Sequence, residues 1–203
     1  DSEVGLNSID EILELLSKDG KKYNLKELEE MGLNPSGLGQ SGLKKILKDP
    51  TDYKAASNFM WSCTMALNGL IQQGVPSDWA VHMMGHELTA LYGIDHARTL
   101  AIITESHYKV SLKDKQEKLA QYAERVWNVT EGTLEEKALA GIKKTTEFFH
   151  SLGIDTKLSD YTKDYKGTAE IISKRFEERG WKGIGEKGKV TPALVEKIVE
   201  MSY

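Results

Sequence analysis

An all-α fold is predicted for this chain of 203 residues, and three observations support the prediction. Apolar residues recur with the period of a helix along most of the sequence. The alternating runs of β-branched residues that mark strands are scarce, and only four prolines occur. A chain of this length suits one large domain or two small ones, and it can bury a core without disulfides.

The first 41 residues are predicted to form a short helical segment that is separate from the rest. Ser8 and Glu11 have the spacing of a capping box, and the helix that they begin is expected to end near Gly20. A second short helix is expected over 25–31. The stretch "GLNPSGLGQSG" (32–42) is rich in Gly, Ser and Pro and is therefore expected to be a loop. We place a domain boundary here, with a larger helical domain over 42–203.

Longer helices are predicted after this boundary. Residues 52–73 are expected to form one helix, and "GVPSDW" separates it from a second, which Ser77 or Asp78 caps and which ends near Gly93. Asp95 is expected to cap a third helix through Tyr108. Several residues lie on apolar helix faces and are expected to be buried: Trp61, Cys63, Trp79 and Trp127.

The remaining elements follow the same pattern. Long amphipathic helices are predicted over 116–129 and 134–152, another over 167–179, and a last one that opens at Thr191-Pro192. "GIGEKG" (183–188) matches the letters of a dinucleotide-binding loop. It follows a charged helix rather than a strand, so a surface loop is predicted instead. His107 and His150 are each expected to be a surface or packing residue.

Composition excludes several function classes. The chain has 27 basic and 31 acidic residues and no long basic run, so no nucleic-acid partner is expected. Cys63 is the sole cysteine and cannot form an intrachain disulfide, which fits a reducing compartment and predicts a cytoplasmic location. No run of eighteen apolar residues occurs and the first residues do not form a signal peptide, so no membrane association is expected.

The stretch "HMMGHELTALYGIDH" contains the best candidate site. His82 and His86 are four residues apart, on one face of the predicted helix. His96 follows a turn at Gly93 and begins the next helix, which can bring it back against the first two. Imidazoles at this spacing suit Zn, Fe, Ni or Cu. The zinc-peptidase pattern H-E-x-x-H is absent, because Met83 follows His82.

Three longer stretches carry a resemblance to a known family. "KDPTDYKAASNFMWSCTMALNGLIQQGVPSDWAVHMMGHELTALYGIDHARTLAII", "KLAQYAERVWNVTEG" and "FFHSLGIDTKLSDY" resemble the iron-containing alcohol dehydrogenases, in the branch of butanol dehydrogenases and broad-range aldehyde reductases. The resemblance runs from about Gly42 to Tyr203. It implies the helical, C-terminal half of a dehydroquinate-synthase-like fold. The α/β domain that holds NAD(P) in this family has no counterpart here.

The resemblance also implies a site for one divalent metal, iron or zinc. His82 and His96 match two of its four ligands, while His86 matches a catalytic-cleft histidine that is not a ligand. The other two family ligands form an Asp-x-x-x-His pair, but no histidine precedes His82. Asp10 and Glu14 are a candidate substitute, since Asp10 lies 72 residues before His82. They equally suit a solvated helix face.

Three functions follow as hypotheses. The first is the metal- and substrate-binding half of an NAD(P)-dependent alcohol dehydrogenase or aldehyde reductase, acting on a small alcohol or aldehyde. This chain alone is then expected to bind no nicotinamide and to be inactive. The second is an inactive helical scaffold or interaction module derived from that family. The third is a stand-alone metalloprotein that uses His82, His96, Asp10 and Glu14. Because the nucleotide domain has no counterpart, an exposed apolar face and a homodimer are also expected.

Overall fold

A computed structural model describes residues 38–203 of the chain. Within that range the secondary structure is helical, and the single β-bridge joins Ile184 to Val190. This confirms the predicted all-α fold. The chain divides into two compact units, Asp1–Ile71 and Gln72–Tyr203. No helix between residues 38 and 203 is long and apolar enough to cross a membrane.

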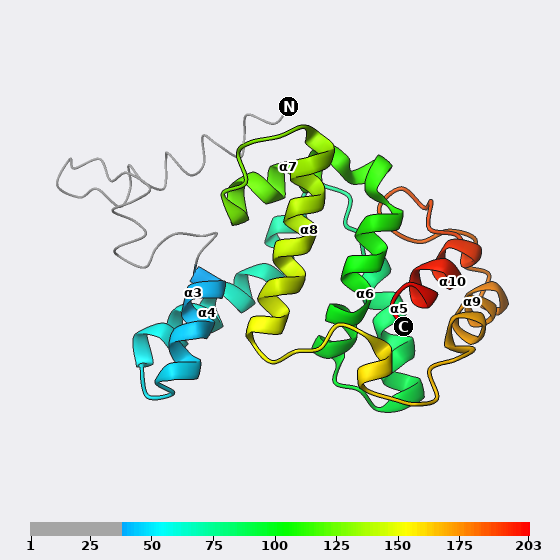
Figure 1. The fold of residues 1–203 in the computed structure, drawn as a ribbon, viewed down its shortest axis with the longest axis horizontal. Coiled ribbons are helices and arrows are strands. Elements are labelled where there is room, and N and C mark those ends of the chain that lie inside the picture. Colours follow the sequence, from blue (N-terminus) through cyan, green and yellow to red (C-terminus); the bar gives the residue numbers. More distant parts are fainter. Residues whose placement is uncertain (1–37) are drawn as a thin grey trace. The chain divides into compact units, whose positions relative to one another are not determined.

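The described part of the first unit contains two helices, α3 (Leu38–Lys48) and α4 (Tyr53–Leu67), which pack against each other (Figure 1). Asp52 caps α4, because its carboxylate accepts a hydrogen bond of 2.9 Å from the backbone N–H of Ala55. The predicted loop is therefore wrong over 38–42, where α3 has already begun. The predicted helices of the first 37 residues lie outside the described range.

The single helix predicted over 52–73 is also wrong at its end. Gly69 has a left-handed φ of +84°, which stops α4. The side chain of Asn68 then accepts a hydrogen bond of 2.9 Å from the N–H of Leu70. A short 3₁₀ helix, η1 (Leu70–Gln72), follows. Apolar residues keep the helical spacing through this break, so periodicity alone did not detect it.

In the second unit, α5 (Ala80–Tyr92) and α6 (His96–Val110) form a tight helical hairpin. Gly93 ends α5 with φ +67°, as predicted, and its N–H donates to the carbonyl of Thr89. Only Ile94 and Asp95 then lead into α6, with Asp95 at its N-cap position. This short connection places the start of α6 beside α5, so that His96 lies close to His82 and His86.

Helices α7 (Leu112–Trp127) and α8 (Leu134–Ser151) lie side by side in the second unit (Figure 1). A capping box begins α8: Thr133 and Glu136 each bond the backbone N–H of the other. Helix α7 begins earlier than predicted, because Ser111 both ends α6 and begins α7.

The chain then passes through η2 (Leu158–Asp160) to α9 (Thr168–Glu178) and α10 (Pro192–Glu200). Thr191 caps α10 and Pro192 occupies its first turn, as predicted. Helix α6 lies between α8 and α10 (Figure 1). Most of the largest fully buried apolar side chains come from α5, α6, α9 and α10: Met84, Leu88, Ile102, Ile103, Ile172, Phe176 and Ile198.

Three of the residues predicted to be buried are exposed. Trp61 and Trp79 are 64% and 40% exposed, and Cys63 is an exposed free cysteine. Trp127 is partly buried, as its neighbours on α7 and α8 cover it. Helical spacing identifies an apolar face of α4, but it does not show whether another element covers that face.

Candidate functional site

Three histidines meet where α5 and α6 join. The ring centroids of His82 and His96 are 5.3 Å apart, and those of His86 and His96 are 4.3 Å apart. His82 and His86 are separated by 6.4 Å. The structure therefore brings together all three of these predicted site residues. Asp10 and Glu14, the other two, lie outside the described residues.

The separation of His82 and His96 fits two ligands on one metal ion. With metal–nitrogen bonds of about 2.1 Å and tetrahedral angles, two imidazole centroids lie roughly 5 Å apart. The observed 5.3 Å agrees with this value. The planes of the two rings are inclined by 58°, so their lone pairs are free to converge on one point.

His86 does not fit the same ion together with His96. Their rings are stacked, with only 3° between the two planes. The lone pair of an imidazole nitrogen lies in the plane of its ring, and two parallel, separated planes share no point. One ion cannot therefore lie in both planes, so the geometry pairs His96 with His82 rather than with His86.

The surroundings keep two of these histidines neutral. Burial lowers the pKa of His82, and the charges of His96 and His86 lower it further. Burial and His86 likewise lower the pKa of His96. His96 also lies at the N-terminus of α6, where the helix dipole disfavours a cation. A neutral imidazole is the form that ligates a metal.

One ring nitrogen of this cluster has no partner. Nδ1 of His96 is buried and makes no hydrogen bond to the described residues. A buried polar atom without a partner carries a desolvation cost of about 1–3 kcal/mol. A metal ion bound to one ring nitrogen of His96 would change which hydrogen-bond partner the other ring nitrogen needs. The donor set and this nitrogen therefore fit an imidazole–metal bond.

Two ligands do not complete a site. Among residues 38–203, no group of three or more His, Cys, Asp or Glu side chains is arranged to hold a metal ion. Structural and catalytic zinc centres take three or four protein ligands, so a metal ion held by His82 and His96 would need further ligands besides these two.

An ion-pair network centred on the buried Glu87 links α5 to the α9 region. The carboxylate of Glu87 accepts hydrogen bonds from Arg175 of α9, at 2.8 Å, and from Arg179, the residue that caps the C-terminus of α9. Burial alone would raise the pKa of Glu87, but the two guanidinium groups outweigh it and lower that pKa. Sequence reasoning missed this network. The four-residue spacing of the two arginines was the available signal, but their partner is 88 residues from Arg175.

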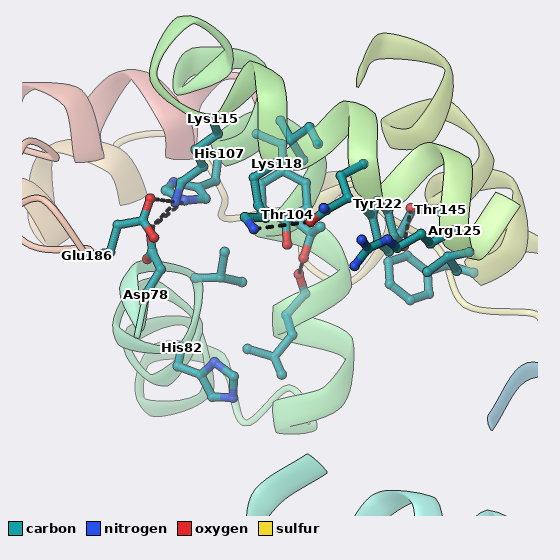
Figure 2. Close-up of a pocket in the computed structure, with 17 residues that line it drawn as sticks. Asp78, His82, Thr104, His107, Lys115, Lys118, Tyr122, Arg125, Thr145 and Glu186 are labelled. Carbon is teal, nitrogen blue, oxygen red and sulfur yellow. Dashed lines mark hydrogen bonds and ion pairs between the residues drawn. The ribbon is translucent and has the colours of Figure 1, made fainter. Parts of the chain in front are cut away.

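A cavity of about 740 Å³ opens beside His82 (Figure 2). Helices α5, α6, α7 and α8 provide most of its wall. At one end Lys115 lies 2.7 Å from Asp78 and 3.0 Å from Glu186. His107 also lines the cavity and is only 1% exposed. His107 was predicted to be a surface or packing residue. It lies four residues after the buried Ile103, on the same face of α6. Nothing in its sequence context indicated a cavity.

Comparisons with known proteins agree with this picture. The model of the C-terminal region of the Fe-containing alcohol dehydrogenase family matches residues 38–200. The chain belongs to this family. The predicted branch is also supported, because its relatives include an aldehyde reductase and a butanol dehydrogenase.

Two relatives of this family illustrate how much of each protein the chain covers. The NADPH-dependent aldehyde reductase YqhD of Escherichia coli is 47% identical over 156 residues, which are 77% of this chain and 40% of YqhD. The NADH-dependent butanol dehydrogenase A of Clostridium acetobutylicum is 35% identical over 162 residues, 78% of this chain and 41% of that enzyme. The chain spans less than half the length of both relatives.

The fold agrees as well. The crystal structure of Escherichia coli YqhD superposes with a TM-score of 0.79 at 42% sequence identity, covering 86% of this chain and 45% of YqhD. The helical architecture is therefore that of the C-terminal part of an iron-containing alcohol dehydrogenase.

Proposed function

We propose that this chain is the metal- and substrate-binding part of an NAD(P)-dependent alcohol dehydrogenase or aldehyde reductase. His82 and His96 are the two metal ligands that its described residues provide. His86 is a residue of the catalytic cleft, beside the metal but not bound to it. The family membership of residues 38–200 supports the reaction class. The names of the relatives support small aldehydes or alcohols as substrates.

The observation that carries the proposal is the pairing of His82 with His96. Their centroids lie 5.3 Å apart, as two imidazoles on one ion require, and the pKa of each is lowered. Both rings are therefore neutral at pH 7 and offer a lone pair. Gly93 makes this arrangement possible, because the tight turn sets the register of α6 against α5.

When bound, a divalent ion supplies Lewis-acid chemistry to a carbonyl or hydroxyl oxygen, and a nicotinamide carries the hydride. The residues of this chain hold the metal ion and orient the side chains around it. His82 and His96 fix two directions of coordination through the α5–α6 hairpin. His86 is exposed and stacks on His96, so it limits the rotation of that ring. The Glu87 network holds the opposite face of α5 in place.

Zinc binding to the purified 203-residue chain tests the proposal. We expect the chain, after treatment with a chelator, to bind zinc in a way that His82→Ala and His96→Ala each abolish or weaken by more than about a hundredfold. His150→Ala is the matched control, because His150 lies on α8 and bonds Thr156 instead. Zinc affinity is measured by competition with a chromophoric chelator, and bound metal by elemental analysis.

Each outcome decides between the hypotheses. A stoichiometric metal that survives both substitutions contradicts the proposed ligands. No metal binding by the unmodified chain favours the inactive scaffold instead. Asp10→Asn and Glu14→Gln test the stand-alone metalloprotein, which requires both carboxylates. If these two variants bind zinc as the unmodified chain does, that third hypothesis is wrong.

The catalytic part of the proposal has its own test. The matched relatives are more than twice as long as the region they share with this chain. We propose that the nicotinamide is bound by residues outside this sequence, so the chain alone should not oxidise NADPH or NADH in the presence of butanal. Measurable turnover by the pure chain, lost in His82→Ala, would show that the described residues suffice for catalysis.

A further inference from the structure

His82 lies in the first turn of its helix. Helix α5 begins at Ala80, so His82 is its third residue. The first turn of a helix frays readily, because its N–H groups have no partners within the helix. The position of a metal ligand in this turn therefore depends on the groups that hold the start of α5.

Asp78 is the side chain that holds the start of α5. Its Oδ1 accepts a hydrogen bond of 2.8 Å from the backbone N–H of Ala80, the first residue of the helix. That N–H has no partner within the helix itself. The negative charge of Asp78 also lies at the positive end of the helix dipole, which stabilises the same turn. Trp79, at the N-cap position, makes no capping bond with its side chain.

Two side chains orient the carboxylate of Asp78 through its other oxygen. Lys115 Nζ lies 2.7 Å from Oδ2, and Nε2 of the buried His107 lies 3.7 Å from the same oxygen. Lys115 in turn pairs with Glu186 at 3.0 Å. Burial alone would raise the pKa of Asp78, but its partners outweigh burial and hold that pKa well below its ordinary value. Figure 2 shows these groups gathered around Asp78, with His82 apart from them.

The contact between Trp79 and His82 extends this arrangement to the histidine. The indole ring packs edge-on against the imidazole, with the ring centroids 4.9 Å apart. Trp79 lies between Asp78 and Ala80, so the hydrogen bond that joins these two residues also fixes the backbone of Trp79. We infer that Asp78 is a positioning residue, which holds His82 in place for the metal through the first turn of α5. This inference rests on the proposed role of His82 as a ligand.

Asp95 offers a matched control on the other helix of the hairpin. It stands at the N-cap position of α6, directly before His96. Its side chain makes no capping hydrogen bond, however, and is 79% exposed beside Arg98. Asp78→Ala and Asp95→Ala each remove one negative charge near the histidines, but only Asp78→Ala also removes a cap.

Hydrogen exchange of a backbone amide measures the order of the first turn without a metal. The N–H of Met83 donates to the carbonyl of Trp79 at 2.9 Å, so this amide is protected only while the turn is formed. In the chelator-treated full chain, we expect Asp78→Ala to speed its exchange about fivefold, the typical effect of losing a helix cap. The amide of Leu88, in the middle of α5, should change little.

Two further variants separate the cap from the charge. Asp78→Asn should restore most of the protection of the Met83 amide, because an asparagine oxygen can still accept from the N–H of Ala80. Asp95→Ala should leave that protection unchanged. Lys115→Met keeps the cap and removes the partner that orients it, so it should speed the exchange less than Asp78→Ala does. It provides a second test if Asp78→Ala does not fold.

Zinc provides the measurement that a merely structural role would not affect. If only the ordered turn presents His82, zinc must in turn order that turn, because such coupling is reciprocal. Saturating zinc should therefore slow the exchange of the Met83 amide in Asp78→Ala nearly to the rate of the zinc-bound unmodified chain. The zinc affinity of Asp78→Ala should be at least about twofold lower than that of the unmodified chain. Asp95→Ala should bind zinc with unchanged affinity.

Two results would overturn the inference. One is exchange of the Met83 amide that Asp78→Ala does not change, since the carboxylate would then not hold the turn. The other is faster exchange with unchanged zinc affinity, in a chain whose zinc binding is lost in His82→Ala. Failure of the proposed function looks different: zinc binding would survive His82→Ala even though Asp78→Ala still sped the exchange. That result would overturn the ligand assignment, and with it the role of Asp78 toward the metal.

Discussion

The imidazole rings of His86 and His96 are stacked, with centroids 4.3 Å apart and 3° between their planes. This relationship separates two histidines that the sequence alone makes look equivalent, since both follow His82 within fifteen residues. A stacked pair cannot share one ion. It can, however, fix the orientation of the ring that does bind, which is the role we propose for His86.

His86→Ala should therefore leave metal binding largely intact. We expect the zinc affinity to fall by less than about tenfold, because only the packing that orients His96 is lost. His96→Ala should cost more than about a hundredfold, since it removes a ligand. Competition with a chromophoric chelator measures both. Equal losses in the two variants would make His86 a ligand and contradict the stacking argument.

Gly85→Ala should disturb the site without touching a histidine. A Cβ at Gly85 would lie 2.9 Å from Thr99 Oγ1 and 3.2 Å from Leu100 Cδ2, both on α6. Thr99 is fully buried and cannot move aside freely. Overpacking costs about 1–3 kcal/mol, against roughly 1 kcal/mol that alanine gains in a helix. We expect a net loss of about 1 kcal/mol in urea unfolding.

The same substitution should lower zinc affinity roughly tenfold, because pushing α5 from α6 changes the separation of His82 and His96. Ala90→Ser is the control: it also adds one heavy atom to α5, at an exposed position. A Gly85→Ala chain with unchanged stability and unchanged zinc affinity would mean that the hairpin tolerates the extra atom, and the proposed coupling would be wrong.

Glu87→Gln should destabilise the fold in a pH-dependent way. The pKa of Glu87 is lowered from its ordinary value of 4.5, so its ionised form stabilises the fold above pH 4.5. That contribution is lost as the pH falls through the lowered pKa of the folded state. We expect Glu87→Gln to cost about 2 kcal/mol at pH 7, where two partly exposed arginines lose their partner.

Well below pH 4.5 the difference between Glu87→Gln and the unmodified chain should shrink toward zero, since both then carry an uncharged side chain. Urea unfolding at several pH values measures this. Glu178→Gln is the control, as Glu178 is exposed on α9. A cost that is the same at pH 7 and at acid pH would assign the effect to packing instead of charge.

The sequence predicted the features that depend on residues close together in the chain. It missed the contacts between residues that are far apart in the chain. The turn at Gly93 and the cap at Thr191 depend on nearby residues, as does the N-cap position of Asp95, whose side chain makes no capping hydrogen bond. The histidine cluster could therefore be anticipated from local features. The contact of Glu87 with Arg175 and the position of His107 on a cavity depend on how helices pack. Periodicity identifies the faces of helices but not their partners, which is also why the exposure of Trp61 was missed.

The exposed apolar side chains around Trp61 predict that the chain associates with itself. Several large apolar side chains of α4 and the residues near it are exposed: Tyr53, Met60, Trp61, Leu67 and Leu70. Large apolar side chains exposed on one helix are often covered by a partner. We expect the chain to self-associate, so its sedimentation coefficient should rise with concentration.

The double variant Trp61→Ser, Leu67→Ser should remove most of this concentration dependence, because both side chains are more than half exposed on α4. Leu139→Ser provides the control: Leu139 is 40% exposed but lies on α8, in the second unit. Sedimentation velocity over a hundredfold range of concentration, about 1–100 µM to span typical weak association, measures the effect. A coefficient that stays at the monomer value throughout would show that the exposed face of α4 does not bind a second copy of this chain.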